Sequence, residues 1–259
     1  MSEKPIDSLY SFKESYLKRR NEIAVLLDES IDVNYLKEEE DVWTQVTSTL
    51  IPLYEKKACF EYLTALKKSK ISSVKIPQFS FINKNLEKNY FKLIPVSGLI
   101  ESRNFLIGLR DSKIYCTRFI RHKDSLDYTS EPDIIHEIMG HAIFFNSPLY
   151  CILNRAFGEA ASKADEDQMK TLERIYWYTI EFGICTENNQ KKAFGAGLLS
   201  SIQELCNFEN LELIPYDLET IARDGFDTMN PHTKLYYFDK NFEESAKIIV
   251  EDIMKIISG

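Results

Sequence analysis

Glu131-Pro132-Asp133-Ile134-Ile135-His136-Glu137-Ile138-Met139-Gly140-His141 places two histidines and a glutamate in an otherwise apolar run. The zinc-protease motif HExxH has histidines four residues apart, whereas His136 and His141 are five residues apart. On a regular α-helix five residues turn the chain by about 500°, which leaves the two side chains ~140° apart. They can reach one ion only if the helix widens by a residue or begins between them, and Gly140 permits such an irregularity.

A third candidate ligand lies in a second apolar run. Residues 175–185 contain one carboxylate, Glu181, with apolar neighbours on both sides. An unpaired glutamate there would be costly to bury unless it stayed protonated, so a cation is its natural partner. The plainer alternative is that Glu181 lies on the exposed face of an amphipathic helix. On spacing alone, Asp133, Glu137 and Glu159 remain possible ligands. Two histidines and a carboxylate are typical of the facial triad of Fe(II) oxygenases, and they also occur in catalytic zinc sites.

The composition excludes several classes of protein. The chain has 259 residues, of which 44% are hydrophobic and 28% charged, and such a chain has enough apolar surface to fold. Its net charge of −8 gives no bulk electrostatic reason to bind nucleic acid or an anionic membrane, so we expect neither partner. No apolar run approaches the roughly 20 residues that a membrane-spanning helix needs.

The cysteines and the two ends of the chain bear on location and assembly. The five cysteines include no CxxC pair, which favours reduced thiols, and the charged N-terminus lacks the apolar core of a signal peptide. We therefore expect a cytoplasmic protein. The chain ends soon after its last predicted helix, without a heptad extension, and from this we expect a monomer.

The periodicity predicts a mainly α fold with a few short β-strands. Apolar residues at helical spacing predict helices at residues 7–27, 37–70 with a boundary or kink at Pro52, 167–182 and 242–257. Short apolar or alternating runs predict strands at 91–96, 113–120 and 234–238. No repeat or Gly/Ser-rich linker interrupts this pattern, so one catalytic domain (residues 41–259) after a charged N-terminal helical extension (residues 1–40) is the simplest organisation.

At this point the sequence resembles the pterin-dependent aromatic amino acid hydroxylases, the family of the phenylalanine, tyrosine and tryptophan hydroxylases. The resemblance runs from about Trp43 to the C-terminus and is closest to the bacterial single-domain phenylalanine 4-hydroxylase type. Three long motifs carry it, in the family's order: residues 128–141, residues 175–185 and residues 192–201. Shorter matches surround Pro77, Pro95, Phe105 and His122.

The resemblance implies Fe(II) held by His136, His141 and Glu181, which with Glu137 form the catalytic group. It also implies tetrahydrobiopterin or a related tetrahydropterin as cofactor, with O2 as co-substrate. The matched pterin-binding positions are Gly98, Leu99, Ile100, Ser102, Phe105, Glu137 and Tyr176. The matched positions for the aromatic amino acid are Arg121, Thr129, Pro132, Trp177, Phe182, Ser200 and Ser201. Arginine suits the carboxylate of the amino acid because its fork of N–H groups binds carboxylates in a bidentate manner.

The implied activity is a monooxygenase that hydroxylates the ring of an aromatic amino acid, with L-phenylalanine to tyrosine as the first choice. Trp177 and Leu99 agree with this choice better than with the tryptophan enzymes, whereas Asp227 would favour tyrosine. Tyrosine, tryptophan or another aromatic substrate of specialised metabolism therefore stays open. A zinc hydrolase and a non-catalytic binding protein are the remote alternatives. The chain departs from the family at Ala142-Ile143, where Val-Pro is usual, and at Tyr115, where animal members have histidine.

Overall fold

The computed structural model describes residues 14–127, 129, 131–226 and 233–258, and the described chain is mainly helical with short strands, as predicted. The α-helices are α1 (Glu14–Ala24), α2 (Lys37–Lys57), α3 (Phe60–Ser69), α4 (Phe79–Leu86), α5 (Ser102–Arg110), α6 (Pro148–Ala161), α7 (Glu166–Tyr176), α8 (Ala196–Leu199), α9 (Ile202–Asn207), α10 (Leu218–Arg223) and α11 (Phe242–Ser258). The strands are β1 (Lys92–Pro95), β2 (Lys113–Cys116), β3 (Ile184–Glu187), β4 (Gln190–Ala193), β5 (Glu212–Pro215) and β6 (Lys234–Tyr237). Two short π-helical segments, called π-turns below, are η3 (His136–Ala142) and η5 (Trp177–Glu181). Three short 3-10 helices are η2 (Glu87–Asn89), η4 (Phe144–Asn146) and η6 (Phe208–Asn210).

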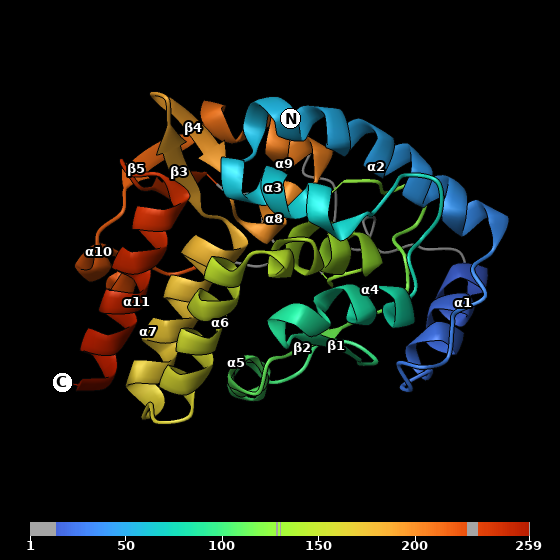
Figure 1. Ribbon diagram of the computed structural model, residues 1–259, viewed down its shortest axis with the longest axis horizontal. Coiled ribbons are helices and arrows are strands. Elements are labelled where there is room, and N and C mark those ends of the chain that lie inside the picture. Colours follow the sequence, from blue (N-terminus) through green and yellow to red (C-terminus); the bar gives the residue numbers. More distant parts are fainter. Residues whose placement is uncertain (1–13, 128, 130, 227–232, 259) are drawn as a thin grey trace.

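Three helices form a packed group on the C-terminal side of the molecule. Helices α6, α7 and α11 contact one another, and α5 packs against α6 (Figure 1). Helix α2 crosses the opposite edge and contacts α9, while α1 lies at the far end beside the first turns of α2. The turn η3 and helix α8 pack together in the middle of the fold, and this is where the site lies.

Two small sheets flank this helical core. Strands β1 and β2 pair in parallel, and a four-stranded sheet has the order β4-β3-β6-β5. Strands β3 and β4 form an antiparallel hairpin, whose turn residues Asn188 and Asn189 have φ of 50° and 61°. Asparagine tolerates this left-handed conformation, which two-residue hairpins favour. Strand β3 begins three residues after Glu181, so the sheet fixes the backbone that follows this carboxylate.

The sequence predicts a helix boundary or a kink at Pro52, and the boundary is wrong. Helix α2 continues through Pro52 to Lys57. The helix ends at Ala58, which has extended φ and ψ angles of −87° and 157°. A proline within a helix removes one backbone hydrogen bond, but packing can outweigh that loss. Trp43, Val46 and Leu50 of the same helix are fully buried.

The other element predictions fared better. The strands at 91–96 and 234–238 and the helix at 242–257 are confirmed within a residue or two as β1, β6 and α11. Strand β2 ends at Cys116, four residues before the predicted end, and α7 gives way to the π-turn η5 at Trp177. The predicted first helix is observed as α1 from Glu14 to Ala24, and its predicted start at Asp7 or Ser8 lies outside the described residues.

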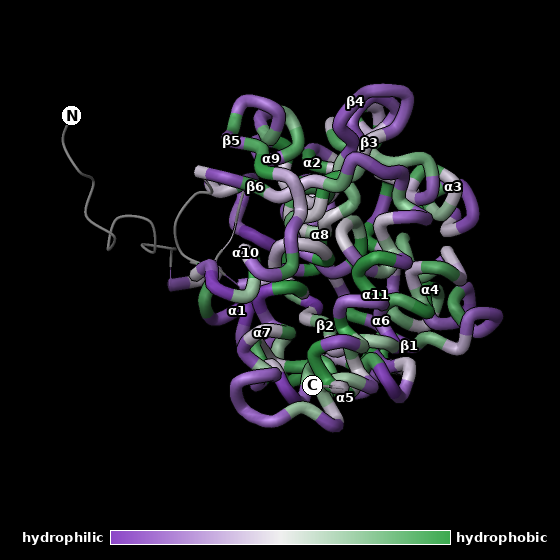
Figure 2. The backbone as a smooth tube through the Cα atoms, turned by 90° about the vertical axis from the view of Figure 1, so that its left-hand side faces the viewer, coloured by the Kyte–Doolittle hydropathy of each residue, from purple (hydrophilic) through white to green (hydrophobic). Residues whose placement is uncertain are grey.

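The hydrophobic core is continuous and rich in aromatic rings. Figure 2 shows hydrophobic segments concentrated inside and hydrophilic ones in the outer loops. Phe144 stacks on Tyr150 with ring centroids 4.2 Å apart, and Phe91 stacks on Phe145 at the same distance. Most of the aromatic residues therefore stabilise the core. Among the described residues, every helix is too short or too polar to cross a membrane.

Candidate metal centre and active site

Both segments that carry candidate ligands are π-turns. In η3 the N–H of Ile143 donates to the carbonyl of Ile138, and in η5 the N–H of Phe182 donates to the carbonyl of Trp177, each at 3.0 Å. Both bonds span five residues, one more than in an α-helix. The widening that the five-residue spacing requires is therefore present in the first segment, and the second widens in the same way.

The π-turns bring three side chains together. Nε2 of His136 and Nε2 of His141 lie 3.2 Å apart. Oε1 of Glu181 lies 3.2 Å from Nε2 of His141, and Oε2 lies 3.5 Å from Nε2 of His136. Donors on adjacent octahedral positions around an ion with bonds of about 2.0–2.1 Å lie roughly 3 Å apart, so these three side chains suit one face of an octahedral ion.

The other candidate carboxylates are engaged elsewhere. Asp133 forms an ion pair with Arg121, Glu137 accepts the N–H of Thr117, and the half-exposed Glu159 lies beside Lys163. Glu181 is thus the carboxylate that completes the group with the two histidines.

Hydroxyl groups orient both histidines. Nδ1 of His136 lies 3.0 Å from Oγ of Ser200, and Nδ1 of His141 lies 3.3 Å from the hydroxyl of Tyr150. When Nε2 binds a metal, Nδ1 carries the proton and donates it to these oxygens. Both hydroxyl oxygens are placed to accept that proton, which suits the tautomer that a metal requires.

The electrostatics of the group also suit a cation. Burial lowers the pKa of His136 to about 4, which keeps its imidazole neutral. Burial alone would lower the pKa of His141 and raise that of Glu181, but their mutual attraction outweighs burial, so the pKa of His141 is raised and that of Glu181 is lowered. An ionised carboxylate beside a neutral imidazole is a donor set that a divalent ion binds.

Gly140 permits this arrangement by its small size. A Cβ atom at this position would lie 2.8 Å from the carbonyl oxygen of Ala196 and 2.9 Å from its Cβ. The described glycines all have negative φ, so close approach to α8 is the reason for glycine here and not a left-handed backbone.

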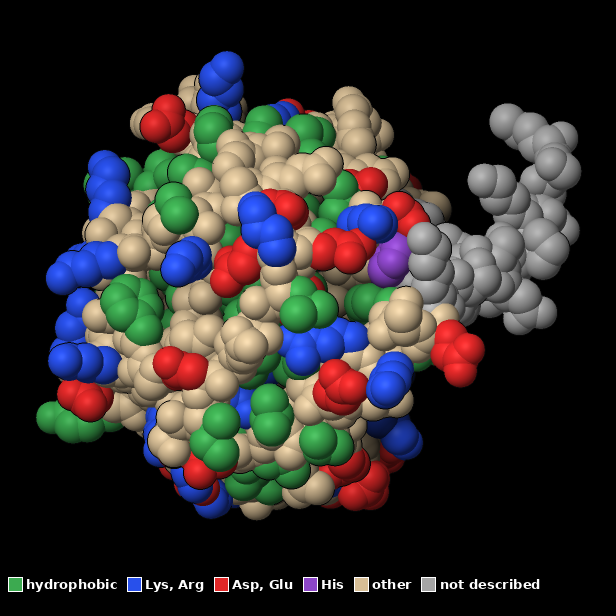
Figure 3. All heavy atoms as spheres, turned by 90° about the vertical axis from the view of Figure 1, so that its right-hand side faces the viewer, with side chains coloured by type: hydrophobic (Ala, Val, Ile, Leu, Met, Phe, Trp, Pro, Cys, Tyr) green, Lys and Arg blue, Asp and Glu red, His purple; other side chains and the backbone are tan. Residues whose placement is uncertain are grey.

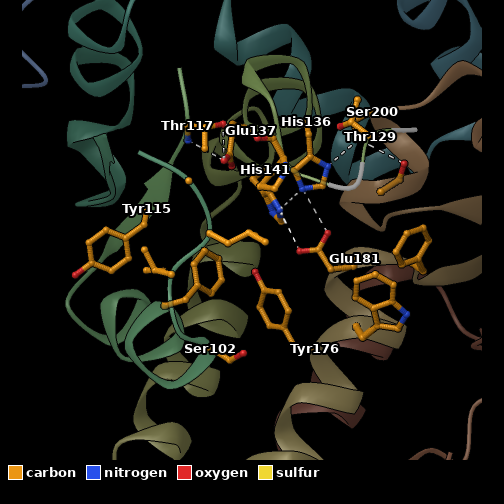
Figure 4. Close-up of a pocket in the computed structure, with 18 of the residues that line it drawn as sticks. Ser102, Tyr115, Thr117, Thr129, His136, Glu137, His141, Tyr176, Glu181 and Ser200 are labelled. Atoms are coloured by element: carbon orange, nitrogen blue, oxygen red, sulfur yellow. Dashed lines mark hydrogen bonds and ion pairs between the residues drawn. The ribbon is translucent and has the colours of Figure 1, made fainter. Parts of the chain in front are cut away.

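The three ligands line a cavity of about 300 Å³, drawn in Figure 4. All the residues that the family resemblance assigns to iron, pterin and substrate border it: Gly98, Leu99, Ile100, Ser102, Phe105, Arg121, Thr129, Pro132, His136, Glu137, His141, Tyr176, Trp177, Glu181, Phe182, Ser200 and Ser201. In the figure, Tyr115 and Ser102 mark one side, Thr129 and Ser200 mark the other, and the histidines and Glu181 lie between them.

The side with Ser102 and Tyr115 combines aromatic side chains with a buried carboxyl group. Phe105 meets Tyr176 edge-on with centroids 5.8 Å apart, and a Cβ at Gly98 would meet nothing within 4 Å. Glu137 accepts the N–H of Thr117 at 2.9 Å, and burial raises the pKa of Glu137 to about 7. A planar heterocycle with polar edges fits such a combination of aromatic surface and a buried carboxyl group.

The opposite side has a wall of aromatic rings. Trp177 contacts Phe182, with centroids 4.8 Å apart, and stacks on Phe226 at 5.0 Å. The sequence did not single out Phe226. It directly precedes residues 227–232, which lie outside the described residues.

The polar residues on this side already have partners within the protein. Arg121 is buried and binds both carboxylate oxygens of Asp133, at 2.6 and 2.9 Å. The Oγ1 of Thr129 donates to the carbonyl of Glu131, and the Oγ of Ser201 caps α9 by accepting the N–H of Glu204. A ligand carboxylate would therefore have to share the N–H groups of Arg121 with Asp133.

Comparison with known families agrees with this geometry. The family described as "Biopterin-dependent aromatic amino acid hydroxylase" matches residues 10–257. Human phenylalanine-4-hydroxylase is 38% identical over 222 residues, which are 83% of this chain and 49% of that protein. The chloroplastic phenylalanine 4-monooxygenase of Pinus taeda is 35% identical over 260 residues, which cover 95% of this chain and 72% of that protein. The chain thus spans about half the length of its human relative.

Solved structures share the fold. The apo structure of the cold-active phenylalanine hydroxylase from Colwellia psychrerythraea 34H superposes with a TM-score of 0.82 at 28% identity, covering 91% of this chain and 92% of that one. The Chromobacterium violaceum phenylalanine hydroxylase with bound iron(III) and 7,8-dihydrobiopterin has a TM-score of 0.81 at 24% identity, covering 92% of this chain and 89% of that one. The second match, at this identity, shows a common fold.

Proposed function

The chain belongs to the biopterin-dependent aromatic amino acid hydroxylases, and from this premise we propose that it hydroxylates the ring of L-phenylalanine to give tyrosine. The reaction uses Fe(II), a tetrahydropterin and O2. The observation that carries the proposal is the His136, His141 and Glu181 triad, placed between two aromatic walls of one cavity. A triad of this kind occupies one face of the metal and leaves positions for oxygen and substrate.

The residues of the triad fit iron. His136 offers a neutral imidazole nitrogen, Glu181 offers an ionised oxygen, and His141 would bind once the metal displaces the proton that Glu181 favours. Ser200 and Tyr150 orient the two rings. When bound, the iron and the tetrahydropterin supply the activation of O2 and the reducing equivalents. The buried surroundings exclude bulk water from the ligands and strengthen their hold on the cation.

We assign the pterin to the side of the cavity that Phe105 and Glu137 border. Phe105 provides a face for stacking, and the backbone of Gly98, Leu99 and Ile100 borders the same space, with Ser102 at the start of α5. Glu137, whose pKa burial raises to about 7, accepts or donates a hydrogen bond at the heterocycle's edge. Its role is to orient the pterin, because Thr117 fixes its own position.

We assign the amino acid to the other side, against Pro132, Trp177 and Phe182. The ring packs on these apolar faces, which position it and keep it dry. Arg121 binds the carboxylate, and Thr129, Ser200 and Ser201 supply nearby hydroxyl groups. Tyrosine, tryptophan or another aromatic compound is the alternative substrate, because the apolar faces of Pro132, Trp177 and Phe182 can pack against any aromatic ring.

A parallel assay of the three amino acids tests the proposal. The protein is loaded with Fe(II), supplied with tetrahydropterin and air, and the products are separated by liquid chromatography. We expect the largest kcat/KM for phenylalanine, with tyrosine as product. A larger value for tyrosine or tryptophan would reassign the substrate, and turnover of none of the three would refute the proposed phenylalanine hydroxylase and leave another aromatic compound as the substrate.

We also propose that the protein is a cytoplasmic monomer. All five cysteines are free thiols, as expected in a reducing compartment. Exposed large hydrophobic residues include Leu17 of α1, Phe60 of α3 and Ile152 of α6, which lie on different helices. Light scattering at micromolar concentration is expected to give the mass of one chain, and a stable dimer or tetramer would contradict the assignment.

A further inference from the structure

The position of Arg121 depends on the backbone around it. Besides Asp133, its guanidinium donates to the carbonyls of Leu126, Asp127 and Ser200, at 3.1, 2.6 and 3.2 Å. A substrate carboxylate has to share these donors, so its affinity depends on where residues 119–127 hold the arginine. The contacts that hold residues 119–127 on the side away from the cavity are therefore relevant to substrate binding.

Helix α1 covers the outer side of the segment. The hydroxyl of Tyr16 donates to the carbonyl of Ile120 at 2.9 Å, and its ring meets His122 edge-on with centroids 5.1 Å apart. Tyr16 thus contacts the residues directly before and after Arg121. Burial, and then the negative charge of Asp133, raise the pKa of Tyr16, so its hydroxyl stays protonated and donates.

One turn along α1, Arg20 contacts the same region at two points. Its guanidinium forms an ion pair with Glu131 and lies over the ring of Phe119, 4.4 Å from the centroid. The carbonyl of Glu131 in turn accepts the hydroxyl of Thr129, which borders the cavity. Arg20 therefore connects the side chains of Phe119 and Glu131, which flank both Arg121 and Thr129 along the chain.

Helix α1 is itself firmly attached. Arg19 binds the Glu39 carboxylate at 3.0 Å and the carbonyl of Asn34 at 2.6 Å. Ile23 is 2% exposed and packs in a small cluster with Val33 and Phe119. Figure 3 faces this end of the molecule and shows acidic and basic side chains intermixed, as expected for a surface tied by separate ion pairs.

We propose that α1 positions Arg121 for the amino acid carboxylate, with Tyr16 and Arg20 as positioning residues. The inference rests on the proposed function, because it assigns the carboxylate of an amino acid to Arg121. It gives the charged N-terminal extension a role in substrate affinity. Neither Tyr16 nor Arg20 borders the cavity, so both act through the segment that carries Arg121.

The test compares Tyr16→Phe and Arg20→Gln with Lys18→Ala, which alters an exposed cation of the same helix. Loss of one hydrogen bond or ion pair of this kind corresponds to about a fivefold change. We expect each of the first two variants to raise the KM for phenylalanine about fivefold, with kcat and the KM for tetrahydropterin unchanged. The Lys18→Ala variant is expected to behave as wild type.

Two further measurements separate positioning from a loss of stability. The charge exchange Arg20→Glu with Glu131→Arg is expected to restore the KM, whereas either change alone raises it. Amide hydrogen exchange at residues 118–127 is expected to accelerate in Tyr16→Phe and Arg20→Gln but not in Lys18→Ala. If amide hydrogen exchange is unchanged in Tyr16→Phe and Arg20→Gln, the proposal is overturned, even if the protein hydroxylates no amino acid. If the protein is active and these two variants keep the wild-type KM for phenylalanine, the proposal is overturned while the proposed function stands.

Discussion

Nε2 of His136 and Nε2 of His141 lie 3.2 Å apart although five residues separate them along the chain. A regular helix would direct these side chains ~140° apart. The single π-turn of η3 removes that divergence, and the second π-turn, η5, carries Glu181 to the same point. The metal centre therefore depends on two backbone irregularities, and the first predictions address it.

Replacing Glu181 by glutamine should abolish stable iron binding. The substitution keeps the size of the side chain but removes the ionised oxygen that pairs with His141. We expect iron near one equivalent in wild type and near zero in Glu181→Gln after desalting, measured by plasma emission spectrometry. The matched control is Glu159→Gln, which changes a half-exposed carboxylate away from the cavity. Equal iron in both variants would contradict the ligand assignment.

Removing the metal should lower thermal stability. A ligand that binds only the folded state stabilises it by about 2.7 kcal/mol at a hundredfold excess over Kd. Scanning calorimetry is expected to show a lower Tm after chelation and recovery on adding Fe(II). In Glu181→Gln the Tm should not respond to either treatment. A response as large as that of wild type would mean that the ion binds elsewhere.

Substituting Gly140 by alanine should destabilise the fold. The new methyl group would lie within 3.0 Å of two atoms of Ala196, and such overpacking costs about 1–3 kcal/mol. Urea unfolding is expected to show this loss. Gly98→Ala is the control, since its added Cβ meets nothing within 4 Å and its effect on stability should be small. The account would be wrong if both variants unfolded at the same urea concentration.

Phe226 should contribute to amino acid binding and not to iron binding. It stacks on Trp177 and borders the cavity while remaining 38% exposed. We expect Phe226→Ala to raise the KM for phenylalanine, with iron content unchanged, because the wall behind the substrate ring loses one aromatic face. Phe60→Ala, at a 69% exposed position of α3, serves as control. A KM equal to that of wild type would remove Phe226 from the substrate wall.

Asp224 should stabilise the fold only above acidic pH. Burial works to raise its pKa, but hydrogen bonds from Lys234 at 2.8 Å and Tyr236 at 2.6 Å outweigh burial and lower it. A carboxyl group with a lowered folded pKa stabilises the protein above its unfolded pKa of about 3.9, and the contribution is lost as the pH falls through the folded value. We expect Asp224→Asn to lower the unfolding free energy at pH 7 by about 1–3 kcal/mol. The difference should shrink towards pH 3, and a constant difference would contradict this sign.

The sequence predicted the mainly helical fold class and the metal ligands, but by different routes. Spacing and a lone carboxylate in an apolar run made His136, His141 and Glu181 candidates, while the resemblance to the hydroxylase family singled them out from the other carboxylates. The continuation of α2 through Pro52 depends on tertiary packing, which local propensity does not contain. Phe226 and the contact of α1 with residues 119–131 join distant parts of the chain, and no local pattern signals such pairs.

Incorporation of labelled oxygen tests the central claim most directly. The Fe(II)-loaded protein is given tetrahydropterin and phenylalanine under an atmosphere of ¹⁸O2, and the product is analysed by mass spectrometry. The account predicts tyrosine that carries one heavy oxygen atom, and no product with Glu181→Gln. Wild-type protein that leaves phenylalanine, tyrosine and tryptophan all unmodified, or a product whose oxygen comes from water, would contradict it.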